Sequence, residues 1–125
     1  MNASQQAQTA YGAGAAPTRS PRSTEYDAFA RVTQRLHAAN QSGKPAFHAL
    51  AAALHDNRRL WALLASSVAD ADNALPADLK STLFYLAEFT QVQTSRILAG
   101  EADASALIEI NMRVMQGLRG EGPPS

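Results

Sequence analysis

Asn57-Arg58-Arg59-Leu60-Trp61 is the stretch that decides the fold, because it carries the only tryptophan of the chain. At about 100° per residue, the apolar side chains around it fall in one sector, which predicts a long amphipathic helix. Asn57 falls in the middle of that sector. A buried amide without partners costs about 1–3 kcal/mol, so Asn57 is expected to bond to a neighbouring helix end, another side chain or a bound partner. Arg58 lies at the sector's edge, where its stem can pack beside Trp61 while its guanidinium reaches outward.

Proline, glycine and capping residues divide the rest of the chain into further helices. Pro21, Pro45 and Pro76 suit helix starts, Gly100 suits the position after a helix end, and Asp103 suits an N-cap. The helices are therefore expected at about residues 21–40, 45–69, 76–99 and 104–118. No strand pattern of period two occurs, and the loops are short enough to make successive helices antiparallel neighbours. The sequence predicts an all-α fold, a small antiparallel bundle of about four helices.

Length and composition favour one domain with tails. The chain has 125 residues, and we expect a helical domain over residues 20–118 between flexible tails over residues 1–19 and 119–125. Eleven Lys and Arg balance eleven Asp and Glu, so no net charge attracts the chain to nucleic acid or membrane. The first 62 residues carry seven basic and three acidic side chains, and the rest carry four and eight. This polarity serves pairing within the bundle, self-association or a charged partner.

The last two predicted helices carry more apolar surface than one packed face requires. In the third helix, Tyr85 and Phe89 lie more than about 90° from the main leucine stripe, and Phe84 points in another direction. In the fourth helix, Met112 and Met115 widen the core stripe sideways. Such surplus either fills an irregular core or forms a surface for a partner, and both readings stay open. For Phe84 the exposed position is favoured.

Side chains that could carry chemistry do not form a recognisable site. His48 and His55 are seven residues apart, whereas a zinc pair on a helix needs a spacing of four, and His37 also suits the surface. Asp70 and Asp72 lack the glycine and the distal glutamate of a calcium loop. We therefore expect no enzyme, no cofactor and no metal. The chain has no cysteine, signal peptide or membrane-length apolar run, so the expected location is the cytoplasm.

Several segments, taken in order, resemble the family of the flagellar biosynthesis regulator FlaF. The resemblance covers about Arg22 to Leu118, and its most specific element is Asn57-Arg58-x-Leu60-Trp61. The other segments that carry it are Thr24-Glu25-Tyr26 with Phe29, Asn73-Ala74-Leu75-Pro76, and Leu107-Ile108-Glu109-Ile110-Asn111 with Met115. In these segments Tyr26, Phe29, Leu60, Pro76 and Asn111 are expected to have structural roles.

The resemblance implies a cytoplasmic protein needed for flagellum assembly. It would bind flagellin as a secretion chaperone, promote flagellin synthesis and export, and oppose the translational regulator FlbT. The alternative is a post-transcriptional regulator that acts through messenger RNA or FlbT without binding flagellin, and direct RNA binding is the less favoured mode. The resemblance brings no catalytic residues.

Our hypothesis for the flagellin site is a hydrophobic groove beside the last two helices that accepts an amphipathic helix. It would use a set of large side chains, namely Arg58, Trp61, Phe84, Tyr85, Phe89, Met112 and Met115.

Overall fold

The computed structural model describes residues 21–41 and 47–118, and most of this part of the chain is helical. Its helices are α2 (Pro21–Gln41), α3 (Phe47–Ala69), α4 (Ala77–Leu98) and α5 (Ser105–Leu118). Each begins and ends within two residues of its expected bounds, and the described residues contain no strand. The all-α fold is therefore confirmed. The tails expected over residues 1–19 and 119–125 lie outside the described residues.

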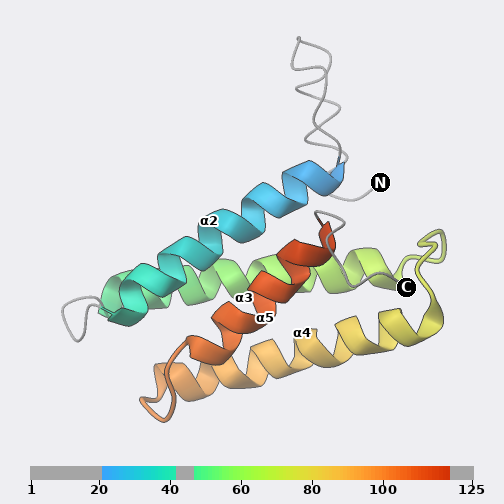
Figure 1. Ribbon diagram of the computed structural model, residues 1–125. Coiled ribbons are helices and arrows are strands. Elements are labelled where there is room, and N and C mark those ends of the chain that lie inside the picture. Colours follow the sequence, from blue (N-terminus) through green and yellow to red (C-terminus); the bar gives the residue numbers. More distant parts are fainter. Residues whose placement is uncertain (1–20, 42–46, 119–125) are drawn as a thin grey trace.

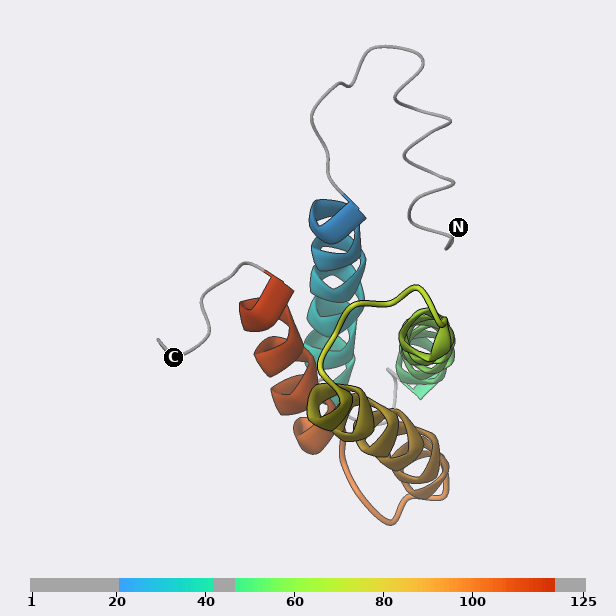
Figure 2. The same ribbon diagram turned by 90° about the vertical axis from the view of Figure 1, so that its right-hand side faces the viewer.

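Helix α3 contacts two neighbours, packing against α2 and against α4, while α5 packs mainly against α2. In Figure 1, α2 and α4 run from right to left, whereas α3 and α5 run back from left to right. In Figure 2, α3 and α5 lie on either side of α2. Helices α4 and α5 share few contacts, since they start from a short connection and then diverge (Figure 1). Helix α4 is thus attached to the bundle chiefly through α3.

The interior contains two apolar clusters. One, here called the bundle-end cluster, consists of Val32, Leu36, Ala53, Leu54, Ile97, Ala104 and Leu107. The other, here called the tryptophan cluster, consists of Phe29, Trp61 and Ala87, with half-buried side chains such as Leu83 and Val114 packed around it. Each helix contributes to the bundle-end cluster and has at least one side chain in or against the tryptophan cluster, so burial of apolar surface holds all four together.

A layer of buried polar side chains lies between the two clusters, although Leu60 packs against both of them. The layer consists of Thr33, Asn57, Thr90, Thr94 and Asn111, and Gln93 is a further buried polar side chain on α4. Along α3, for example, Leu54 belongs to the bundle-end cluster, Asn57 to the polar layer and Trp61 to the tryptophan cluster. Every one of the four helices contributes to this layer, which makes it a feature of the whole bundle.

Helix α4 ends where the glycine at position 100 predicts. Gly100 has φ +78°, a left-handed conformation that glycine adopts at little cost. The Gly100 amide donates to the Ile97 carbonyl and the Glu101 amide donates to the Arg96 carbonyl, the two bonds of a Schellman motif. The Asp103 carboxylate then accepts from the Ser105 amide at 2.9 Å and caps the start of α5.

Candidate functional site

Trp61 lies at the centre of the molecule and not on its surface. Its side chain is fully buried, and its ring meets the Phe29 ring edge to face, with centroids 5.7 Å apart. Its Nε1 donates a hydrogen bond of 2.8 Å to Asn111 Oδ1. The expectation that Trp61 contacts a partner does not fit this burial, because side chains of α2, α4 and α5 pack around it.

Asn111 links three helices through its amide. Its Nδ2 donates to Thr33 Oγ1 at 3.1 Å and to Asn57 Oδ1 at 2.7 Å, while its Oδ1 accepts from Trp61. The partner expected for Asn57 is therefore another side chain. Asn57 Nδ2 is buried and has no hydrogen-bond partner, which leaves part of the desolvation cost of that amide uncompensated.

Arg58 connects α3 to α4. Its Nη2 donates to the Gln91 carbonyl at 2.6 Å and to Ser95 Oγ at 2.9 Å, and Gln91 Nε2 returns a longer bond of 3.5 Å to the Arg58 carbonyl. The guanidinium therefore does not reach outward as expected, because the backbone of α4 lies within its range. Arg59, the next residue, is exposed. Two of the hydrogen bonds that the Arg58 guanidinium can donate are therefore made within the fold, to α4.

The five remaining candidate side chains do not share one groove. Tyr85, Met112 and Phe84 have exposed fractions of 67%, 53% and 40%, whereas Phe89 and Met115 are half-buried against the two apolar clusters. The predicted exposure of Phe84 is confirmed. The single groove expected beside α4 and α5 is not, since these helices diverge and their side chains point to different faces.

The outer side of α4 carries one exposed apolar surface. Tyr85 and Val92 are seven residues apart, about two helical turns, and therefore lie on the same side of the helix. Val92 has an exposed fraction of 57% and was not among the candidate side chains, although the helical period places it in the same sector as Tyr85.

Met112 belongs to a different surface, a hollow of about 640 Å³ between α2 and α5. His37 and Asn40 line it from α2, and Ile108, Met112 and Arg113 line it from α5. Its lining mixes polar and apolar groups, so it differs in chemistry from the Tyr85 side of α4.

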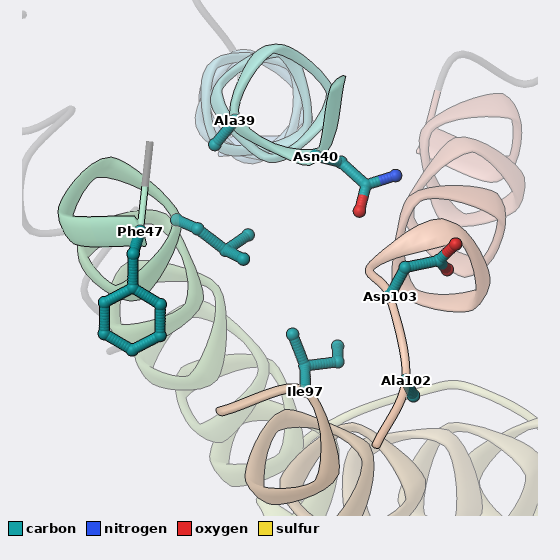
Figure 3. Close-up of a pocket in the computed structure, with 7 residues that line it drawn as sticks. Ala39, Asn40, Phe47, Ile97, Ala102 and Asp103 are labelled. Atoms are coloured by element: carbon teal, nitrogen blue, oxygen red, sulfur yellow. The ribbon is translucent and has the colours of Figure 1, made fainter. Parts of the chain in front are cut away.

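A second hollow, of about 530 Å³, lies at the end of the bundle (Figure 3). Phe47 and Leu50 line it from α3, Ile97 from α4, and Ala102 and Asp103 from the connection between α4 and α5. Sequence reasoning missed this hollow, because its lining comes from segments that become neighbours only in the folded chain.

The remaining motif residues have structural surroundings. Leu60 packs against both apolar clusters, Tyr26 is half-buried, and Pro76 directly precedes α4. Arg35 pairs with Asp56 across α2 and α3 at 2.6 Å, and this hydrogen bond lowers the pKa of the Asp56 carboxyl below its ordinary value.

Metal-binding and membrane-spanning features are not found in the described part of the chain. His37, His48 and His55 are exposed, and no cluster of three possible ligands occurs among residues 21–41 and 47–118. No helix in these two ranges combines the length and the hydropathy needed to cross a bilayer.

These observations define a class of protein, a small helical bundle. Side chains of its most distinctive motif, Asn57-Arg58-x-Leu60-Trp61, bond the helices of the bundle to one another, and its large exposed apolar side chains lie on separate faces. The chain belongs to the FlaF family, since the family model described as flagellar protein FlaF matches residues 7–118. The match begins fifteen residues before Arg22, where the resemblance was expected to start. No curated protein and no solved structure matches the chain.

Proposed function

We propose that this FlaF-family chain is a flagellum assembly factor that binds flagellin in the cytoplasm as a secretion chaperone. It promotes flagellin synthesis and export, and it opposes the translational regulator FlbT. Family membership supports the flagellar role. The observation that carries the binding role is the outer side of α4, where Tyr85 and Val92 are 67% and 57% exposed although the interior has its own complete clusters.

A helical partner suits this surface for a simple geometric reason. Tyr85 and Val92 form a short apolar row along α4, and Phe84, about 100° away, widens it. An amphipathic helix recognises such a row with anchors spaced by three, four or seven residues. Secretion chaperones cover the apolar helices of subunits that have not yet assembled, and this row offers matching apolar area at about 25 cal/mol per Å² buried.

Co-purification from cells tests the proposal, with the tagged full chain as bait and flagellin, FlbT and RNA as readouts. The wild-type chain should retain flagellin, and a chain with both Tyr85→Ser and Val92→Ser should lose it while keeping its helicity by circular dichroism. Leu63→Ser is the matched control, because Leu63 is a 51% exposed apolar side chain on α3. A wild-type chain that retains no flagellin contradicts the proposal, and unchanged retention by the double variant contradicts the assignment of this surface.

The alternative, regulation through messenger RNA or FlbT without flagellin, receives less support from the arginines. Arg35 is paired with Asp56, and Arg58 is bonded to α4, so both guanidinium groups already have partners within the fold. Arg31 and Arg59 are exposed. If RNA co-purifies in place of flagellin and is lost steeply with salt, this alternative replaces the chaperone role.

A further inference from the structure

The hollow at the bundle end is built by segments from all parts of the fold. Asn40 is in the last turn of α2, Phe47 and Leu50 in the first turn of α3, Ile97 in the last turn of α4, and Ala102 just before α5. Figure 3 shows Phe47, Asn40 and Asp103 around the opening, with Ile97 on a further side and the Asp103 carboxylate directed outward from the rim. Its volume of about 530 Å³ lies within the range of about 300–1,000 Å³ typical of ligand pockets.

The walls are apolar and one of them is unusually exposed. Phe47 has an exposed fraction of 49%, Leu50 and Ala102 are half-buried, and Ile97 is 4% exposed. Ile97 and Leu50 also belong to or pack against the bundle-end cluster, so the hollow opens directly onto the core. Apolar surface of this kind is favourably covered by an apolar side chain from outside.

The polar groups at the rim are held in place by backbone bonds. Asn40 Oδ1 accepts from the Ala104 amide at 3.0 Å, and Asp103 Oδ1 accepts from the Ser105 amide at 2.9 Å. Because it accepts the Ser105 hydrogen bond, the pKa of the Asp103 carboxyl is lowered, so this group is a carboxylate at neutral pH. A carboxylate has about four acceptor positions, and it can therefore also bind a donor from outside.

The charge at this rim has one sign among the described residues. Asp103 is the single charged side chain in the lining, and Glu101 is an exposed neighbour two residues before it. His48 contacts Phe47 ring to ring on α3, with centroids 6.2 Å apart. An apolar cavity with a carboxylate rim complements an apolar side chain that has a cationic neighbour.

We propose that the bundle-end hollow binds a partner polypeptide by enclosing one large aliphatic or aromatic side chain, while a Lys or Arg within one helical turn of it pairs with Asp103. The inference rests on the proposed function in one respect, namely that the polypeptide is flagellin. It defines a second contact, separate from the Tyr85 side of α4.

Two variants of the full chain test the two halves of this contact. Ala102→Leu fills the hollow and should weaken binding about tenfold or more, as blocking an anchor pocket does. Asp103→Asn removes the charge but retains an oxygen that can cap α5, since Asn and Asp are equally good N-caps. It should weaken binding about threefold and reduce its dependence on salt, because the lost pair is exposed at the rim.

The measurement is the affinity of each purified chain for purified monomeric flagellin, by isothermal titration calorimetry at two salt concentrations. Ala62→Leu is the matched control, because it adds the same side chain at an exposed position of α3 outside the hollow. Thermal melts by circular dichroism establish that each variant is folded. Wild-type affinity in both variants overturns this inference and leaves the proposed function standing, whereas a wild-type chain that does not bind flagellin overturns the proposed function itself.

Discussion

A single amide, that of Asn111, satisfies three different side chains in the interior. It accepts from Trp61 and donates to Thr33 and Asn57, so it bridges α5 to both α2 and α3. Asn57 has a weaker position in the same network, because its Nδ2 has no partner. The two asparagines, although both are fully buried, are therefore not energetically equivalent.

This asymmetry predicts different costs for two identical substitutions. Asn111→Leu leaves the buried Trp61 Nε1 without an acceptor and should lower the free energy of unfolding by about 2–4 kcal/mol. Asn57→Leu breaks one hydrogen bond but also removes the unpaired Nδ2, so it should lower that free energy by about 1 kcal/mol or less. Urea unfolding of both chains, followed by circular dichroism, measures the difference. Equal losses would contradict the assigned roles.

Among the helices, α4 depends most on one neighbour. It packs on α3, makes few contacts with α5, and presents buried Thr90 and Thr94 to the interior. The hydroxyls of these threonines donate to carbonyls of their own helix, at Leu86 and Thr90. The direct polar connection between α4 and α3 in the described residues is therefore made by Arg58 and Gln91, with Ser95 as a further acceptor.

Removing this connection should loosen α4 selectively. Arg58→Met keeps most of the apolar stem but removes the donors to the Gln91 carbonyl and Ser95. Amide hydrogen exchange should become faster along α4, with smaller changes in α2 and α5. Arg59→Met is the control, because Arg59 is exposed and is one residue away. Equal effects on every helix, or the same effect from the control, would show that Arg58 is not the specific link to α4.

The two glycines that the structure describes should respond in opposite directions to alanine. Gly100 has φ +78°, so a methyl group there strains the backbone, although no atom lies within 4 Å of the added Cβ. Gly117 is inside α5 and also has free space around it. Gly100→Ala should lower the free energy of unfolding by about 1 kcal/mol, and Gly117→Ala should raise it by about 0.5–1 kcal/mol. The midpoint of thermal unfolding should fall for Gly100→Ala and rise for Gly117→Ala. A stabilised Gly100→Ala chain would contradict the role assigned to the left-handed backbone conformation at Gly100.

Helix positions were more predictable from the sequence than helix faces. Gly100, Asp103 and Pro76 act within a few residues of their own position, so the ends of α4 and the start of α5 followed directly. The directions of Arg58 and Trp61 depend on which helices lie beside α3, and the sequence alone did not contain that information. The bundle-end hollow could not be predicted for the same reason.

At the scale of the whole molecule, the polar layer divides one interior into two apolar clusters. An apolar layer in its place would bury more hydrophobic surface, but it would also permit the helices to shift against one another. Hydrogen bonds with defined partners fix the relative positions of α2, α3 and α5 at this level. Such polar positions can determine helix register in bundles at some cost in stability.

If the layer determines how the helices pack and does not add stability, replacing the hydrogen-bond network of Asn111 should change the packing and leave the stability unchanged. The variant replaces all four side chains of the network: Thr33→Val, Asn57→Leu, Trp61→Phe and Asn111→Leu. We expect its free energy of unfolding to be within about 1 kcal/mol of the wild-type value or higher, since no donor in the network is left unpaired. Its amide NMR spectrum should nevertheless lose dispersion, because the substituted helices can adopt more than one packing. Stability is measured by urea unfolding and dispersion by a two-dimensional ¹H–¹⁵N spectrum. If the free energy of unfolding falls as much as it does for Asn111→Leu alone, the network contributes net stability. If the spectrum is unchanged, apolar packing already determines where each helix lies.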